Sequence, residues 1–392
     1  AYALSPNGYA PHNSDSDRPL SDASQAIKPL LARGPILAAA DAYDRPDWRY
    51  IATNGEEGAR PPRSPSVLFP WAGQLIMRSG WEAEAQWGFF DLGPWGILHQ
   101  HNDMLHLSVT AGGRDLLVDS GRYTYQHYMG EAGTWRSYFI GSAAHNVICV
   151  DGLEQTNGPA LAARPVEAVI TPAYDYAQGT YAGGFTDVAT AAARHKAYLY
   201  RWELPRDAVR EDITHTRGVL YLRGVGWVVV DRVTLMQPRR VTPLWHFHPD
   251  CTVACEAQSV VTVDAGVGNL RIQPVAPFEW EIELVRGREG PDFQGWYSPE
   301  MDVRLPNTCA IYAANLPRTA TFAWLLLPGN GAVPACSVTA YDAPEGAVHL
   351  RLDIPGQAPL EIAVRLDEAL PLRLTSGEML TAPCAVRPAE GR

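Results

Sequence analysis

The sequence predicts a mainly β protein, with a large antiparallel β-sandwich, a small C-terminal β-sheet and a short helical N-terminal tail. From residue 64 onward, short runs of alternating or β-branched residues recur, for example at 73–79, 105–110 and 226–233. Gly, Pro, Asn or Asp residues interrupt these runs about every ten residues, as in strands joined by turns. Long helical periodicity is missing, which argues against a helical bundle.

Three regions follow one another along the chain. Residues 1–63 contain the loop signature Asn13-Ser14-Asp15-Ser16-Asp17-Arg18-Pro19, a short helix capped by Ser21 or Asp22, a second short helix over 37–42 that Pro46 closes, and a linker over 55–65. Residues 64–330 form the sandwich, with further strands at 115–119, 146–150, 196–202, 244–248 and 321–327. Residues 331–392 form the small sheet, with strands at 348–354, 360–366 and 372–374.

Composition and charge restrict the function. The 392 residues are 46% hydrophobic and 19% charged, as in a globular protein. The net charge is −11, from 32 Lys and Arg against 43 Asp and Glu, and no basic stripe is present, so nucleic-acid binding is not expected. The same charge favours a weakly charged uronate polymer over a densely sulfated one. Twelve Trp residues suit either a core or sugar-stacking surfaces.

The cellular compartment stays open. Of the six cysteines, only Cys251 and Cys255 are close in the sequence, and the second cysteine pair that a zinc ribbon needs is missing. The spacing is compatible with disulfides and equally with free buried thiols. No apolar run approaches the ~20 residues of a membrane span. Ala1-Tyr2-Ala3 has the small-x-small pattern of a cleavage site, but no charged and apolar leader is present.

The strongest local signal is His99-Gln100-His101-Asn102-Asp103. On an extended strand, residues i, i+2 and i+4 share a face, so His99, His101 and Asp103 could converge on one divalent ion such as zinc. A purely structural role for the histidines explains this motif alone equally well.

Further motifs follow in order. Residues 115–125 read DLLVDSGRYTY, residues 135–139 read WRSYF, and residues 143–155 read AAHNVICVDGLEQ. This succession resembles the heparinase II/III-like family of polysaccharide lyases, densely over 93–155 and more loosely over 69–248. Several ordered motifs at compatible spacing are more specific than any one of them.

The resemblance implies a β-sandwich that follows an N-terminal α/α toroid, with the catalytic cleft between the two. It implies that His101, Asp119 and His145 bind one divalent metal, usually zinc, with a mainly structural role. His99 would then face the cleft, and Asp103 is left with a structural role. A bacterial periplasmic or secreted location is expected, with the cytoplasm left open.

The activity that the resemblance implies is β-elimination at a uronic acid, in which a base removes the C5 proton and an acid protonates the leaving oxygen. His99 and Tyr123 are the predicted catalytic residues, although Tyr125 is a nearly equal candidate and both tyrosines could simply pack in the sandwich. The predicted substrate-binding residues are Arg122, Arg136, Tyr125 and His248, of which the two arginines could bind carboxylates in bidentate fashion.

Other interpretations of the same residues stay open. His246-Phe247-His248 could join His99 and His101 in a cupin-like metal site, although the Glu and later His of cupins are missing. Asp103 with Glu82, Glu84 or Glu154 could serve a glycoside hydrolase. A non-catalytic, sugar-binding sandwich is a third interpretation. His127, His195 and His215 stand alone and are expected at the surface.

The chain also departs from the family's pattern. Residues 1–63 are too short and too proline-rich for a toroid and resemble only its tail. We therefore expect two partners, an acidic polysaccharide or oligosaccharide and an N-terminal toroid chain of the same enzyme. The alternative is a naturally reduced member of the family that binds sugar without cleaving it.

Overall fold

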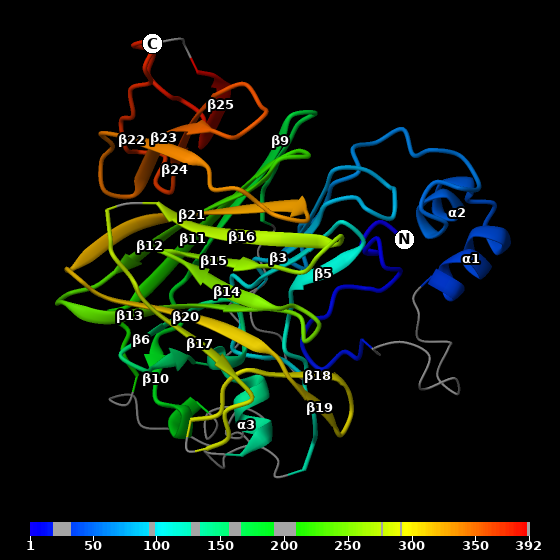
Figure 1. Ribbon diagram of the computed structural model, residues 1–392, viewed down its shortest axis with the longest axis horizontal. Coiled ribbons are helices and arrows are strands. Elements are labelled where there is room, and N and C mark those ends of the chain that lie inside the picture. Colours follow the sequence, from blue (N-terminus) through cyan, green and yellow to red (C-terminus); the bar gives the residue numbers. More distant parts are fainter. Residues whose placement is uncertain are drawn as a thin grey trace.

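The computed structural model describes residues 1–18, 33–93, 99–126, 134–156, 166–191, 209–275, 277–290 and 292–389. Antiparallel sheets are the main regular structure of this part of the chain, and the few helices lie at its margins (Figure 1). The predicted sandwich is therefore confirmed. The predicted helix after Ser21 or Asp22 and the predicted strand at 196–202 lie outside the described residues.

The middle layer is an eight-stranded sheet whose central strands are buried on both faces. In sheet order its strands are β14 (Val253–Glu256), β15 (Ser259–Thr262), β16 (Gly268–Val275), β21 (Thr319–Asn330), β12 (Gly226–Thr234), β11 (Thr214–Leu222), β9 (Tyr174–Tyr181) and β8 (Val169–Ile170). Along β12, Val229 and Val233 pack into one core, and Val228 and Val230 into another. Burial of both faces explains the unbroken apolar run at 227–230, because successive strand residues point to opposite faces.

Two smaller sheets cover one face of this layer. The first contains β1 (Val67–Phe69), β2 (Gln74–Arg78), β3 (Trp87–Asp91), β4 (Leu107–Ala111) and β5 (Arg114–Leu117), and the second contains β17 (Glu281–Arg286), β20 (Thr308–Leu316), β13 (Arg239–His246) and β6 (Ile148–Val150). Trp227 and Trp324 of the middle sheet share a core with Leu107 and Trp245. The loops that leave β3 and β5 and enter β6 build the site described below.

The C-terminal sheet covers the opposite face of the middle layer, and Figure 1 shows it above β21 and β12. Its strands are β22 (Ser337–Tyr341), β23 (Ala347–Asp353), β24 (Leu360–Arg365) and β25 (Cys384–Pro388). Leu350 and Ile362 pack against Leu325 of β21. The predicted strand at 372–374 is wrong, because only an isolated bridge joins Arg373 to Met379 across a tight turn.

Short elements frame these layers. They are the helices α1 (Arg33–Ala42), α2 (Pro46–Ala52) and α3 (Trp135–Ile140), the 3-10 helix Ser142–Ala144, and the two-stranded sheets of β7 (Glu154–Gln155) with β10 (Phe185–Thr186) and of β18 (Trp296–Glu300) with β19 (Val303–Pro306). The predicted helix over 37–42 is confirmed within α1. Pro46 begins α2 rather than only closing α1, because proline fits the first turn of a helix, where its missing N–H has no helical partner.

Residues 1–18 run along the sandwich as a strap of turns and irregular backbone (blue in Figure 1). The ring of Tyr2 meets that of Trp81 edge-on at 5.7 Å. At the other end of the strap, Arg18 pairs with Asp115 of β5 at 2.8 Å, and both side chains are largely buried. These contacts fix the strap, including Asp15, against the sheet that carries the candidate site.

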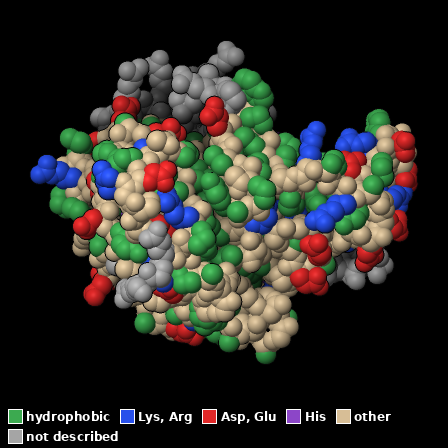
Figure 2. Space-filling view, turned by 90° about the horizontal axis from the view of Figure 1, so that it is seen from above, with side chains coloured by type: hydrophobic (Ala, Val, Ile, Leu, Met, Phe, Trp, Pro, Cys, Tyr) green, Lys and Arg blue, Asp and Glu red, His purple; other side chains and the backbone are tan. Residues whose placement is uncertain are grey.

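Three further expectations meet the structure here. All six cysteines are free thiols. The helices among the described residues are too short or too polar to cross a membrane. Acidic and basic side chains are interspersed on the face shown in Figure 2, and neither sign forms a continuous stripe there.

Candidate metal centre and adjoining site

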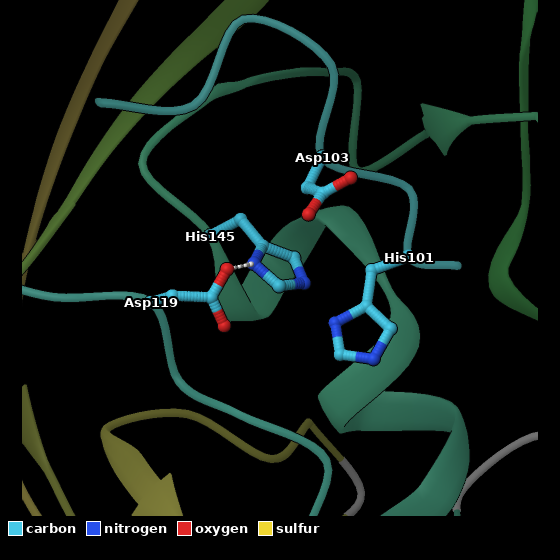
Figure 3. Close-up of side chains that lie close together, drawn as sticks. All are labelled: His101, Asp103, Asp119 and His145. Atoms are coloured by element: carbon cyan, nitrogen blue, oxygen red, sulfur yellow. Dashed lines mark ion pairs between the residues drawn. The ribbon is translucent and has the colours of Figure 1, made fainter. Parts of the chain in front are cut away.

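Four side chains from three loops meet at one point. His101, Asp103, Asp119 and His145 each place a ligand atom within 4.8 Å of the others, and all four residues are buried (Figure 3). The sequence predicted three of them as ligands, and the structure adds Asp103. The expected extended strand through these residues is wrong, since the described residues 99–106 contain no strand and His99 has a φ of 62°. A turn closed by the bond from the His106 N–H to the Asp103 carbonyl directs Asp103 inward instead.

The buried polar atoms of this cluster fit a metal ion. His101 Nδ1, His145 Nε2 and Asp103 Oδ2 are buried and have no hydrogen-bond partner, and Asp119 Oδ2 has only its ion pair with His145. Leaving such atoms unpaired costs about 1–3 kcal/mol each, so they indicate a missing ligand. Two imidazoles and two carboxylates form a donor set that suits zinc. The cluster can therefore hold a metal ion.

The charges in the cluster agree with this interpretation. Burial lowers the pKa of His145, but Asp119, whose Oδ2 lies 3.2 Å from His145 Nδ1, raises it more, to about 9. Burial raises the pKa of Asp119, but His145 holds it well below the ordinary carboxyl range. Burial also raises the pKa of Asp103, against the pull of His145 and His101. A bound cation would favour the ionised carboxylates and release the proton of His145.

The sequence motif around Asp119 has a local explanation. Its Oδ1 accepts a hydrogen bond from the N–H of Gly121 at 2.8 Å, which turns the chain directly after the carboxylate. Gly121 has a φ of 76°, and a Cβ there would lie 2.3 Å from the carbonyl oxygen of Ser298. Only glycine fits this position, so the D-x-G spacing follows from the geometry.

Arg217, buried in β11, holds the loops of two cluster residues. Its Nη1 donates to the carbonyl of Leu105 at 2.9 Å, two residues after Asp103, and to that of Asn146 at 2.6 Å, directly after His145. Asp231 balances its charge at 2.7 Å. His215 also bonds Asp231 and is fully buried, so the prediction of a surface position for His215 is wrong. Its burial follows from the two buried faces of the middle sheet.

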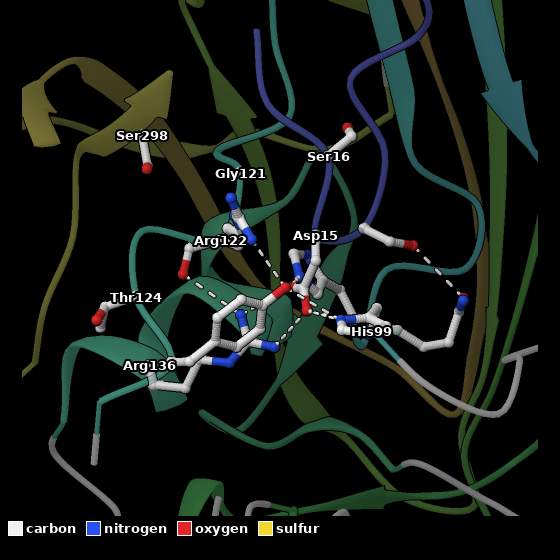
Figure 4. Close-up of polar contacts among 12 residues, drawn as sticks. Asp15, Ser16, His99, Gly121, Arg122, Thr124, Arg136 and Ser298 are labelled. Atoms are coloured by element: carbon white, nitrogen blue, oxygen red, sulfur yellow. Dashed lines mark hydrogen bonds and ion pairs between the residues drawn. The ribbon is translucent and has the colours of Figure 1, made fainter. Parts of the chain in front are cut away.

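A second group of polar side chains adjoins the cluster (Figure 4). Asp15 of the strap accepts hydrogen bonds from both terminal nitrogens of Arg136, at 2.6 and 2.9 Å. The same carboxylate lies 2.8 Å from Nδ1 of His99 and 3.0 Å from Nε2 of His101. The side chain of His99 is 57% exposed, whereas that of Asp15 is 4% exposed. His99 thus lies at the surface edge of a buried polar network.

Tyr125 completes this edge. Its hydroxyl lies 3.1 Å from Nδ1 of His99 and accepts a bond from Nη1 of Arg122 at 2.8 Å. The guanidinium carbons of Arg122 and Arg136 lie 5.0 and 5.1 Å from the centre of its ring. Arg122 itself pairs with Asp17 of the strap at 2.8 Å.

Tyr123 lies in different surroundings. Its hydroxyl accepts a bond from Arg304 at 2.6 Å, and its ring contacts those of Trp135 and Phe139. Of the two tyrosines that the sequence left nearly equal, Tyr125 is therefore the one beside His99. The catalytic role predicted for Tyr123 stays a prediction.

The second histidine pair lies apart from His99. His246 is buried and bonds Asn146 and Gln294 at 3.2 and 3.0 Å, so it is a satisfied core residue. His248 is buried against the ring of Tyr297 at 5.5 Å, and its substrate-binding role stays a prediction. Sequence reasoning missed Asp15, because an Asn-Ser-Asp-Ser-Asp run reads as a loop and its partners lie 84 residues or more along the chain.

Residues 61–351 match the family model described as heparinase II/III-like, C-terminal. The chain belongs to this family. No curated protein matches it significantly. Among solved structures, this heparinase II/III-like chain resembles the heparan sulfate lyase HepC from Pedobacter heparinus, with a TM-score of 0.71 and 18% identity over 93% of this chain and 51% of that one.

Two heparinase III structures are similar as well. One has a TM-score of 0.69 and 16% identity over 93% of this chain and 51% of that one, and the other has 0.66 and 17% over 91% and 52%. At such identities the likeness shows a shared fold. The heparinase II/III-like chain spans about half the length of the solved structures it matches.

Proposed function

We propose that this chain carries the metal-containing half of a lyase that cleaves a uronic-acid polysaccharide by β-elimination. The observation that carries the proposal is the pair of exposed His99 and adjacent Tyr125 at the edge of a buried metal-type cluster. Membership of the heparinase II/III-like family supports it. The similar structures are a heparan sulfate lyase and heparinases III, and the uronic-acid class is proposed by analogy with them.

His99 and Tyr125 have the arrangement that paired proton transfer needs. A carboxylate can only accept, so the bond to Asp15 places the proton of a neutral His99 on Nδ1 and leaves Nε2 to accept one. The hydroxyl of Tyr125 can give or take a proton; burial raises its pKa, and the hydrogen bond from Arg122 opposes that rise. We propose that one of these groups removes the C5 proton of the uronate and the other protonates the leaving oxygen.

The metal has a supporting place in this proposal. His101, Asp119 and His145, with Asp103, would hold zinc, which when bound balances the buried carboxylates. The ligands come from loops after β3, after β5 and before β6, so the filled site would keep these loops in register with one another. His99 lies two residues before His101, so a metal bound by His101 would also restrict the position of His99.

The substrate carboxylate needs a partner from elsewhere. Arg136 is 1% exposed and gives both terminal nitrogens to Asp15, and Arg122 is paired with Asp17. Neither guanidinium is available in this arrangement to neutralise a uronate. We therefore propose that an N-terminal helical part or chain supplies the missing donors. The acidic charge of −11 favours a weakly charged uronan as substrate.

Product analysis tests the proposal. The enzyme together with its N-terminal part is incubated with alginate, heparan, hyaluronan or glucuronan, and the ultraviolet absorbance of the new C4–C5 double bond is followed. We expect a rise on at least one uronan and its loss in His99→Ala. New reducing ends without this absorbance would indicate a glycoside hydrolase, and binding without any product would indicate a sugar-binding module. Either result contradicts the proposal.

A further inference from the structure

We propose that Asp15 is a positioning residue that couples the metal centre to His99 by fixing the orientation and tautomer of both His99 and His101. For the part that concerns catalysis, this inference rests on the proposed function. For the part that concerns the metal, it rests on the cluster alone.

Each carboxylate oxygen of Asp15 accepts hydrogen bonds from one histidine and from Arg136. Oδ1 accepts from His101 Nε2 at 3.0 Å and from Arg136 Nη1 at 2.6 Å, and Oδ2 accepts from His99 Nδ1 at 2.8 Å and from Arg136 Nη2 at 2.9 Å. The backbone N–H of Asp15 also donates to the carbonyl of His99 at 3.2 Å. One residue of the strap thus holds His99 by both backbone and side chain.

The carboxylate fixes which nitrogen of each ring carries the proton. Because ionised Asp15 only accepts, Nε2 of His101 and Nδ1 of His99 must both be N–H donors. In the neutral rings the lone pairs are then on Nδ1 of His101 and on Nε2 of His99. The first is a buried, unpartnered atom on the side of the metal cluster (Figure 3), and the second belongs to an exposed ring.

Arg136 allows this carboxylate to stay ionised while buried. A lone buried carboxylate is costly, whereas a bidentate guanidinium compensates its charge and directs both oxygens. Arg136 is placed by α3, which starts with a capping box between Thr134 and Ser137. A histidine that ligates a metal and donates its other N–H to a carboxylate is a recurrent arrangement that strengthens metal binding. Here the same carboxylate also reaches a second, exposed histidine.

The competing explanation is that Asp15 only fastens the strap to the sandwich. Asp115 provides a matched control, because it fastens the same strap through Arg18 at 2.8 Å and Asn7 at 3.1 Å. Like Asp15 it is a poorly exposed carboxylate, with 12% of its side chain accessible. It contacts neither His99 nor His101.

The first test compares Asp15→Asn with Asp115→Asn in the full enzyme. In asparagine an NH₂ group replaces one of the two carboxylate oxygens. The histidine that donates to that oxygen then loses its acceptor. We expect zinc affinity, measured by competition with a chromogenic chelator, to fall by about 10–100-fold in Asp15→Asn. We expect kcat on a cleaved uronan to fall by at least about tenfold with little change in KM, because the substrate itself is not contacted. Asp115→Asn should leave both quantities within about threefold.

Equal losses in the two variants would mean that Asp15 only anchors the strap, and unchanged zinc affinity in Asp15→Asn would overturn the inference outright. The zinc measurement needs no turnover, so it separates a failure of this inference from a failure of the lyase assignment.

A second test uses the unaltered chain and so does not depend on the folding of a variant. In a crystal structure of the zinc-loaded protein, His101 should bind the metal through Nδ1 while its Nε2 stays within hydrogen-bond distance of Asp15. Coordination through Nε2, or a displaced Asp15, would refute the inference.

Discussion

Replacing Arg217 by methionine should weaken both the fold and the metal centre. Arg217 is fully buried and forms a bidentate pair with Asp231, with distances of 2.7 and 3.2 Å. Its remaining nitrogen satisfies the carbonyls of Leu105 and Asn146. Methionine fills much of the same volume and provides none of these donors.

The expected magnitude follows from these contacts. Breaking a buried pair by removing one partner costs about 3–5 kcal/mol. Each carbonyl left unpaired adds about 1–3 kcal/mol, but the terms overlap because water can enter the space and reach both. We therefore expect the free energy of unfolding to fall by about 4–6 kcal/mol, which is large for one substitution.

Urea unfolding of the metal-free protein, followed by tryptophan fluorescence, measures this loss. Arg232→Met is the control, because Arg232 lies in β12, is 30% exposed and only approaches Glu345 at 3.7 Å. Its loss should stay below about 1 kcal/mol. A loss below about 2 kcal/mol for Arg217→Met, or one equal to the control, would refute the reasoning.

The effect should also depend on pH. Burial raises the pKa of Asp231, but Arg217 and His215 lower it further, to about 2. A carboxyl with a depressed pKa stabilises the fold above its ordinary value of 3.8, and that contribution is lost as the pH falls through about 2. The difference between wild type and Arg217→Met should therefore shrink over this acidic interval.

Three further outcomes are expected. Zinc affinity should rise by roughly tenfold per pH unit up to about pH 9, because His145 must lose its proton to bind the metal. Calorimetry in two buffers should detect the released proton, and a flat pH profile would exclude His145 as a ligand. Tyr125→Phe should lower kcat by about 10²–10⁴-fold and Tyr123→Phe by less than about tenfold, and the reverse order would support the catalytic role predicted for Tyr123 instead. His99→Ala should abolish turnover while zinc affinity changes by less than about threefold; strongly weakened zinc binding would place His99 among the ligands.

The fold was largely predictable because its strands have distinctive patterns. Alternation marked the strands with one buried face, and the run at 227–230 marked a strand buried on both. The order of strands within the sheets was not predictable. It depends on pairings such as β12 with β21, whose partners, from Trp227 with Leu326 to Thr234 with Thr319, lie about ninety residues apart.

The site was predictable where its residues belong to short motifs and not where distant segments meet. His101, Asp119 and His145 fall in motifs that resemble a family, and the structure brings them together. Asp103 joins them because a turn, rather than a strand, follows His99. Asp15 was recognised only as part of the loop at residues 13–19, because a loop aspartate acquires a role only through the tertiary contacts around it.

The strap has a practical consequence for dividing this protein into parts. The matched family region begins at residue 61, and a fragment cut there would keep every metal ligand and His99. It would lose Asp15 and Asp17, so Arg136 and Arg122 would be left as uncompensated cations beside the histidines. We expect such a fragment to bind anions at these two guanidiniums, which Asp15 and Asp17 pair in the intact chain. Boundaries for expression should therefore be chosen by which side chains meet, and residues 1–18 belong with the sandwich.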